Sequence, residues 1–144
     1  MDNHQIAKRY VDAVMAADPQ RMAEVVCDDV EVQYPQSGEV IRGRDNYLAV
    51  LENYPGGLAG TVDMELSGAS REVSVVRPAP FSMPQITVSG SGNLFVAEGV
   101  ATYPDGGVYY VAMIMHFEGG EVRRETWYFG EPFEAPAWRE PFTE

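Results

Sequence analysis

The spacing of apolar residues changes along the chain, from a helical period in the first third to a period of two in the remainder. Ile6, Ala7, Tyr10, Val11 and Val14 recur three and four residues apart, which predicts an amphipathic helix. Later segments alternate apolar and polar residues, which is typical of strands with one exposed face. The pattern therefore predicts an α+β domain with its helices first.

Polar residues and prolines mark the ends of the predicted helices. Asp2 and Gln5 are spaced to form a capping box at the start of the first helix. Asp18 followed by Pro19 predicts an N-cap and a proline at the first helical position. The short second helix that begins there carries Met22, Val25 and Val26. A third helix follows Gly43, presents Tyr47, Leu48, Leu51 and Tyr54 on one face, and stops at Pro55-Gly56-Gly57.

The strands are predicted from shorter patterns. Residues 30–34 form a brief strand before Pro35, and residues 62–66 form another that residues 72–77 extend. A proline-broken connection follows over residues 77–84, and residues 89–92 are a flexible link. Residues 93–103, 108–117 and 122–129 then form an antiparallel meander, joined by glycine turns at residues 104–107 and 118–120.

The segment 108–117 has no polar face. One side offers Tyr109, Val111, Met113 and Met115, and the other offers Val108, Tyr110, Ala112, Ile114 and His116. A strand that is apolar on both sides needs cover on both sides. The helices cover one face, and a symmetric second copy is the simplest cover for the other. We therefore expect a homodimer that packs through the outer sheet face, with Trp127 near the contact.

Composition excludes several classes of partner. The chain has 144 residues and a formal net charge of −12, which argues against binding to nucleic acid or to an anionic membrane. Cys27 is the single cysteine, so no internal disulfide forms, and its apolar surroundings indicate a small buried hydrophobe. The two histidines are far apart and no cysteines cluster, so we expect no metal site and no cofactor. No apolar run reaches the roughly 20 residues of a membrane span, and the polar N-terminus lacks a signal-peptide core, which favours the cytoplasm.

Several segments together resemble the nuclear transport factor 2-like superfamily, and its SnoaL-like branch in particular. They are Arg9-Tyr10-Val11, residues 28–32, residues 41–44, Met115-His116-Phe117 and the tail 131–139. The resemblance covers essentially the whole chain. It implies one domain over residues 1–144, in which a cone-shaped, curved antiparallel sheet wraps round three N-terminal helices as a cystatin-like α+β barrel. Residues 131–144 would form a C-terminal tail that packs over this domain. Members of the superfamily include isomerases, epoxide hydrolases, dehydratases, polyketide cyclases and non-catalytic binding modules, so fold alone does not settle function.

Two departures argue against steroid isomerase activity. The steroid isomerases of this fold use a tyrosine in the first helix, which Tyr10 matches, together with a carboxylate base and a protonated carboxylic acid. Tyr34 stands where the resemblance places the base, and a phenol is neutral near pH 7. Met115 stands where it places the acid, and methionine has no proton to donate.

Strand alternation predicts which side chains face the helices. If Met113 and Met115 point inward, pairing across the Asp105-Gly106 turn brings Glu98 and Thr102 inward as well. On the last strand, Arg124 and Tyr128 would face inward, whereas a shift of one residue would reverse each assignment. The candidate catalytic residues are Glu98 and Tyr10, and the candidate ligand contacts are Tyr34, Thr102, Met113, Met115, Arg124 and Tyr128. The alternative is that Glu98 pairs with Arg124 as a structural ion pair or faces solvent.

The predicted function is the binding of a small hydrophobic molecule, such as a polyketide, a terpenoid or a steroid-like compound, in an apolar pocket. A lyase, isomerase or hydrolase is the enzymatic form of this prediction. The alternative is a non-catalytic binding or interaction module that lacks the catalytic carboxylates. A pocket carboxylate within hydrogen-bonding reach of a tyrosine would favour the enzyme, and a pocket filled by Met113, Met115 and aromatic rings would favour the module.

Overall fold

The computed structural model of the chain describes residues 1–55, 62–66, 71–75, 86–103 and 105–144. Three helices come from the first third: α1 (Asn3–Met15), α2 (Pro19–Ala23) and α3 (Arg44–Glu52). The strands are β1 (Val26–Tyr34), β2 (Glu39–Arg42), β3 (Val62–Leu66), β4 (Arg71–Val75), β5 (Ile86–Ser91), β6 (Leu94–Thr102), β7 (Val108–Glu118) and β8 (Glu121–Gly130). A 3₁₀ helix, η1 (Ala137–Phe142), lies near the C-terminus.

The helix starts agree with the sequence patterns. Asp2 Oδ1 accepts a hydrogen bond from the Gln5 backbone N–H at 2.8 Å, and Gln5 Oε1 accepts one from the Asp2 N–H at 3.1 Å, so the capping box is confirmed. Asp18 caps α2 with Pro19 at its start, as predicted. The second helix is shorter than predicted, because the backbone is already extended from Val26 onward as β1. Among these described helices, none is long and apolar enough to cross a membrane.

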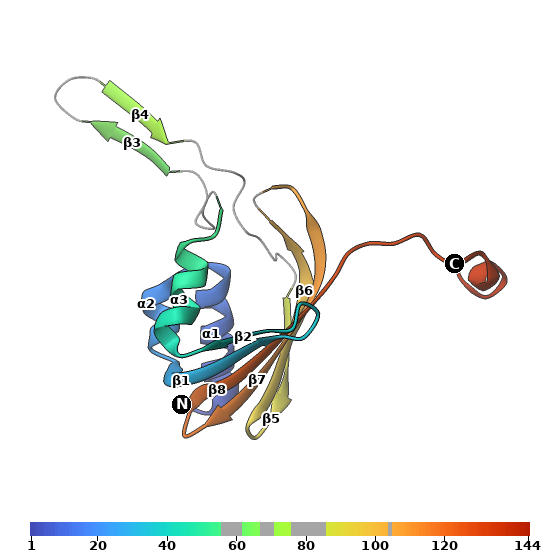
Figure 1. The fold of residues 1–144 in the computed structure, drawn as a ribbon, viewed down its shortest axis with the longest axis horizontal. Coiled ribbons are helices and arrows are strands. Elements are labelled where there is room, and N and C mark those ends of the chain that lie inside the picture. The colour runs from blue at the N-terminus through green and yellow to red at the C-terminus, as the bar shows by residue number, and fades with distance from the viewer. Residues whose placement is uncertain (56–61, 67–70, 76–85, 104) are drawn as a thin grey trace.

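One curved sheet carries the helices on a single face (Figure 1). Its strand order is β2-β1-β8-β7-β6-β5, and the sheet is not closed into a barrel. All neighbours are antiparallel except β1 and β8, whose parallel pairing the prediction of an antiparallel sheet did not include. The α+β class is confirmed.

Three segments differ from the predicted strands. Residues 39–42 and 86–91 are strands β2 and β5, although no strand was predicted at the first and a flexible link covered part of the second. β4 pairs with β3 as a separate two-stranded sheet instead of extending it. The predicted proline-broken connection over residues 77–84 lies outside the described residues, as do Gly56, Gly57 and Pro104 of the predicted turns.

The core lies between the helices and the inner sheet face. Tyr10 and Val11 of α1, Met22 of α2 and Tyr47 of α3 pack toward the sheet and are almost fully buried. The sheet contributes its own buried residues, which are Val26, Val30, Val32, Phe95, Ala97, Ala101, Val111, Met113, Met115, Phe117, Val122, Glu125 and Trp127. Glu125 is the charged residue within this otherwise largely apolar set.

The turn between β6 and β7 is one residue longer than predicted, which changes the side chains of β6 that face the helices. Thr102 pairs with Val108, and the Tyr103 N–H donates to the Gly107 carbonyl at 2.9 Å, so the loop spans residues 104–106. The prediction placed a two-residue turn there. One extra loop residue shifts the register, and a shift of one residue turns every side chain to the other face. Glu98 is therefore exposed beside Ala112 on the outer face, and Thr102 also lies on that face, so the inward placement of both is wrong.

A β-bulge in β8 changes which side chains of that strand face the helices. Phe117 pairs with Val122, but the preceding residue, His116, pairs with Arg124, which leaves Arg123 as an extra residue in β8. Beyond the bulge, the parity of the strand is reversed. Arg124 and Tyr128 therefore lie on the outer face, and their predicted inward placement is wrong. The residues that face the helices are Glu125, Trp127 and Phe129, so Trp127 does not lie on the outer face where a dimer contact was predicted.

The C-terminal tail leaves the end of β8 and runs away from the domain (Figure 1). Phe133, Trp138 and Phe142 keep 79%, 71% and 82% of their surface exposed. In the single chain, the tail therefore does not cover its own domain, contrary to the prediction. The physical reason is its extended course after Gly130, which carries it past the edge of the sheet.

Candidate functional site

A buried carboxyl group is held by two tyrosine hydroxyls on the inner face of the sheet. Glu125 of β8 has no exposed surface. The Tyr10 hydroxyl, from α1, donates to Glu125 Oε2 at 2.7 Å, and the Tyr47 hydroxyl, from α3, donates to Oε1 at 3.1 Å. The two hydroxyl oxygens lie 3.2 Å apart. Two helices and one strand thus converge on a single acidic group.

Burial shifts the protonation of this cluster. Loss of hydration raises the pKa of Glu125 from 4.5 to about 7. The hydroxyl groups of Tyr10 and Tyr47 and the indole N–H of Trp127 lower this pKa in part, because they stabilise the carboxylate. Burial, and then the charge of Glu125, raise the pKa values of Tyr10 and Tyr47 well above 10. Near neutral pH, the carboxyl group therefore exists in both forms while both phenols keep their protons.

Trp127 completes the cluster with an unpaired donor. It lies two residues after Glu125 on the same face of β8, and its indole Nε1 is buried without a hydrogen-bond acceptor among the described residues. The indole N–H is near enough to Glu125 to oppose the rise in its pKa, but not at hydrogen-bonding geometry. A buried donor without an acceptor costs about 1–3 kcal/mol. A ligand atom that accepts this hydrogen would remove that cost.

A cavity of about 460 Å³ lies next to the cluster, between α3, the β1–β2 turn and the β6–β7 turn. Tyr47 and Trp127 are on its wall, and Glu125 lies behind them. Its lining is mostly apolar and half aromatic, and it consists of Val14, Tyr34, Gln36, Ser37, Glu39, Tyr47, Val50, Leu51, Tyr54, Tyr103, Asp105, Tyr109, Trp127 and Phe129. This combination of apolar walls and a few polar groups is typical of small-molecule sites.

The aromatic rings of the cavity wall pack against one another in stacked and edge-to-face pairs. Trp127 and Phe129 stack with 5.7 Å between ring centroids and 7° between planes. Tyr103 meets Tyr109 edge to face at 5.3 Å. Burial raises the pKa values of Tyr34 and Tyr103, so both hydroxyls stay protonated. These walls suit a flat, uncharged ligand.

The structure places the predicted site residues in three different environments. Tyr34 lines the cavity, and Tyr10 lies behind it in the Glu125 cluster. Met113 and Met115 face inward as predicted but belong to the core and not to the cavity wall. The four on the outer face are Glu98, Thr102, Arg124 and Tyr128.

Sequence reasoning missed Glu125 because it carried the register through the β7–β8 turn without a bulge. A signal was present in the alternation itself. Trp127 and Phe129 are large and apolar and share the parity of Glu125, whereas Arg124 and Tyr128 share the opposite parity. Aromatic residues at alternate positions favour the buried face. Parity counted from Trp127 would have placed Glu125 inside.

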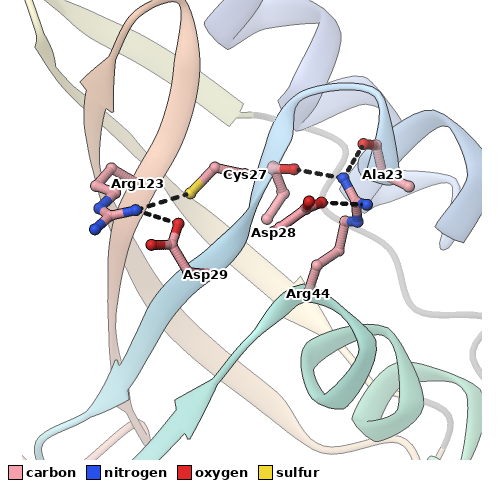
Figure 2. Close-up of polar contacts among 7 residues, drawn as sticks. Ala23, Cys27, Asp28, Asp29, Arg44 and Arg123 are labelled. Atoms are coloured by element: carbon pink, nitrogen blue, oxygen red, sulfur yellow. Dashed lines mark hydrogen bonds and ion pairs between the residues drawn. The ribbon is translucent and has the colours of Figure 1, made fainter.

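Two arginines fix the strands and helix that carry the cluster (Figure 2). Arg123, the bulge residue, forms an ion pair with Asp29 and approaches Cys27 Sγ at 3.9 Å, which ties β8 to β1. Arg44 opens α3, pairs with Asp28 and donates to the Ala23 carbonyl at 3.3 Å. Burial raises the pKa of the Cys27 thiol, which keeps it protonated and a poor nucleophile. These contacts are structural and position Glu125 and Tyr47.

Comparisons with known proteins support the fold and its family. No model of a protein family matches the chain, and no curated protein matches it. A solved NTF2-like protein of unknown function from Burkholderia xenovorans LB400 is 32% identical, with a TM-score of 0.71 over 99% of this chain and 93% of that one. A candidate ketosteroid isomerase from Kribbella flavida is 21% identical, with a TM-score of 0.76 over 99% and 87% of the two chains. A candidate polyketide cyclase from Pseudomonas putida is 16% identical, with a TM-score of 0.64 over 90% and 92%.

Proposed function

The chain belongs to the NTF2-like proteins, and from that membership we propose that it is an enzyme that binds a small hydrophobic molecule in the aromatic cavity and exchanges a proton with it. Glu125 is the proposed general acid or base, and Tyr47 is proposed to transfer the proton between Glu125 and the ligand. The reaction class is an isomerisation or elimination that moves a proton next to a carbonyl group.

One observation carries this proposal: a fully buried carboxyl group, bonded to two tyrosines, lies directly behind the wall of a ligand-sized cavity. A general acid or base works best when its pKa is near the working pH. Burial brings the pKa of Glu125 to about 7. A carboxyl group that served only to fill the core would be replaced at lower cost by an apolar side chain.

The proton path follows from the contacts. Tyr47 lines the cavity and also bonds Glu125, so its hydroxyl connects the two. When protonated Glu125 acts as the acid, Tyr47 gives its hydroxyl proton to the ligand and takes the carboxyl proton in return. Glu125 is left as the carboxylate, and the reverse transfer restores it. Tyr10 keeps its hydrogen bond to the other carboxyl oxygen and stabilises that charge.

The test is deuterium exchange into 2-tetralone, a neutral bicyclic ketone with acidic α-hydrogens, followed by mass spectrometry in D₂O. We expect the protein to accelerate exchange, and Glu125→Gln to lower the rate by about a hundredfold or more, the usual loss for a general acid or base. Binding is followed separately through Trp127 fluorescence in a Trp138→Phe background. The matched control is Glu24→Gln, because Glu24 is an exposed carboxyl group at the end of α2, away from the outer sheet face. A Glu125→Gln protein that binds the ketone and exchanges it at the parent rate would contradict the proposal.

The competing function is a non-catalytic binding module, and one observation favours it. Glu125 is not itself on the cavity wall, so a ligand can occupy the cavity without touching the carboxyl group. Under this alternative, 2-tetralone binds and quenches Trp127, but its exchange does not exceed that in buffer. The same experiment therefore separates the two functions.

We also propose that the chain forms a homodimer through the outer sheet face. Val100, Tyr110 and Tyr128 on that face keep 40%, 56% and 44% of their surface exposed. Large apolar and aromatic side chains grouped in this way mark contact surfaces in soluble proteins. Light scattering coupled to size exclusion gives the mass in solution, and a mass of one chain at every concentration would exclude the dimer.

A further inference from the structure

Two apolar surfaces are left exposed by the described residues, and they lie on the same side of the molecule. One is the tail, residues 131–144, with its exposed Phe133, Trp138 and Phe142. The other is the outer face of β6, β7 and β8, where Tyr110 and Tyr128 lie toward the end of β8 that leads into the tail. The tail runs away from the helices, toward the space that this outer face looks onto (Figure 1).

The tail has a defined local structure although it is separated from the domain. Its hydrogen bonds join tail residues to one another, such as Arg139 N–H to the Pro136 carbonyl at 3.0 Å. Arg139 also lies over the Trp138 ring at 5.4 Å. Within the described residues, no hydrogen bond or ion pair joins the tail to the rest of the chain. The short 3₁₀ helix exposes the rings of Trp138 and Phe142, and such a helix has little stability of its own in water, so contact with a partner surface would stabilise it.

The outer face suits this tail in charge as well as in hydrophobicity. Arg124 of β8 lies on that face, and Arg42 of the nearby β2 is already paired with Glu31. The tail carries Glu131, Glu134, Glu140 and Glu144 against one arginine. In a chain with a formal net charge of −12, a basic group beside an apolar strip is a specific match for an acidic, aromatic segment.

We infer that the tail of each subunit docks on the outer sheet face of a second copy, so that the two tails are exchanged in the dimer. The inference rests on the proposed homodimer and adds to it a defined contact between residues 131–144 and the outer face. A second copy that covers this face lies on the side toward which the tail already points, and the tail reaches it without reversing direction. Aromatic anchors such as Trp138 contribute most of the free energy of binding in protein contacts of this kind.

The test is a cross-link between differently labelled chains. In a Cys27→Ala background, Ala137→Cys protein, which keeps the neighbouring Trp138, is mixed with ¹⁵N-labelled Tyr110→Cys protein, and a short bismaleimide is added. We expect cross-linked pairs that contain one chain of each isotope. Gln20→Cys is the control in place of Tyr110→Cys, because Gln20 is exposed on α2, on the helical side. It is expected to give no such pair.

A second measurement separates failure of this inference from failure of the homodimer. A chain that ends at Gly130 is expected to dimerise at least about tenfold more weakly than the full chain, since one buried aromatic anchor accounts for that much. A dimer of unchanged affinity, without cross-links between tail and face, would overturn the tail exchange and leave the homodimer intact. Cross-linking within one chain of the Ala137→Cys/Tyr110→Cys double variant, with no mixed pairs, would also overturn it. A full chain that stays monomeric at every concentration would overturn both the tail exchange and the homodimer.

Discussion

Glu125 illustrates how one residue acquires a function from its surroundings. An ordinary glutamate is charged at neutral pH, but here the carboxyl group is fully buried, and burial disfavours the charged form. Two tyrosine hydroxyls stabilise the charge in part, so the pKa of Glu125 stops near 7 instead of rising further. The balance between burial and hydrogen bonding is what makes the group able to give and take a proton.

This balance predicts how stability depends on pH. Because the folded pKa of about 7 exceeds the ordinary value of 4.5, the folded state binds more protons between these values, and stability falls as pH rises through that window. Glu125→Gln cannot ionise and escapes this loss. The free energy of unfolding of the variant, relative to the parent, should therefore increase by about 3 kcal/mol between pH 4.5 and pH 8. Urea unfolding at both pH values measures it.

Glu24→Gln is the matched comparison, since Glu24 is exposed at the end of α2 and its substitution removes the same formal charge. A gain for Glu125→Gln across this pH range that does not exceed the change for Glu24→Gln would contradict the buried geometry of Glu125.

Trp127 predicts what the ligand carries. The Trp127 ring is on the cavity wall, and its indole N–H is buried without an acceptor among the described residues, so a ligand that brings a carbonyl oxygen within reach of this N–H should gain a hydrogen bond. 2-Tetralone and tetralin share a bicyclic skeleton, but only the first has an acceptor. Trp127→Phe should weaken 2-tetralone about five- to tenfold, the usual worth of one neutral hydrogen bond, and leave tetralin nearly unchanged. Competition against a bound fluorescent probe such as 1-anilinonaphthalene-8-sulfonate measures both ligands.

Equal losses for the two ligands would mean that Trp127 contributes only its aromatic surface. A direct readout is the indole N–H signal in ¹H–¹⁵N spectra of the Trp138→Phe protein, where Trp127 is the remaining tryptophan. Its proton should move downfield with 2-tetralone and not with tetralin.

At the scale of elements, the helices and the strand order of the meander could be predicted, whereas the register could not. Capping residues such as Asp2 and Asp18 act locally, through hydrogen bonds to the next turn, so the sequence reveals them directly. The faces of β6 and β8 depend on one extra loop residue before Gly107 and on the bulge at Arg123. Each inserts a single residue, and each reverses the face of every residue beyond it.

The candidate site was predictable only in part, for the same reason. Tyr10 lies on α1, and Tyr34 lies at the end of β1, beyond the register shift between Val26 and Glu31 and within the part of the strand that the sequence predicts. Glu125 lies beyond the bulge, and the choice of Glu98 in its place came from the shifted register. A pocket carboxyl group within hydrogen-bonding reach of a tyrosine was the predicted sign of an enzyme, and Glu125 bonds two tyrosines behind the cavity wall. The position was assigned to the wrong strand.

The β5–β6 hairpin offers a test of its backbone requirement. Gly90 has φ +142°, and a Cβ there would lie 2.2 Å from the Leu94 carbonyl oxygen. Gly92 has φ +61° with no atom within 4 Å of its Cβ position, so alanine there faces only the left-handed backbone cost of about 1–2 kcal/mol. Gly90→Ala should therefore lower the free energy of unfolding by at least about 2 kcal/mol and by more than Gly92→Ala. Chemical unfolding of both variants measures the difference, and equal losses would argue against the close approach of Gly90 to β6.

At the scale of the whole molecule, the two faces of the sheet serve different purposes. The inner face holds the core, the Glu125 cluster and part of the cavity wall, while the outer face presents Val100, Tyr110 and Tyr128 with no cover from the described residues of the same chain. A sheet with apolar residues on both faces is stable in water when a second layer covers the exposed one. The tail supplies additional apolar surface on that side.

The proposed dimer therefore predicts that charge is tolerated on one side of the molecule and not on the other. Tyr110→Arg places a cation among the exposed apolar side chains of the outer face, where dimerisation would bury it without a partner, and such a change costs several kcal/mol of association free energy. Gln20→Arg adds an arginine on the helical side, so it makes the same change to the net charge of −12. Sedimentation velocity should give a monomer for Tyr110→Arg and a dimer for Gln20→Arg at the same concentration.

Ligand binding should survive in the monomer, because Glu125 and its tyrosines lie on the opposite face from Tyr110. Addition of 2-tetralone to monomeric Tyr110→Arg should therefore still quench Trp127 fluorescence. If both variants are dimers, the subunit contact lies away from the outer face. If Tyr110→Arg loses ligand binding together with the dimer, the second copy is needed to complete the cavity.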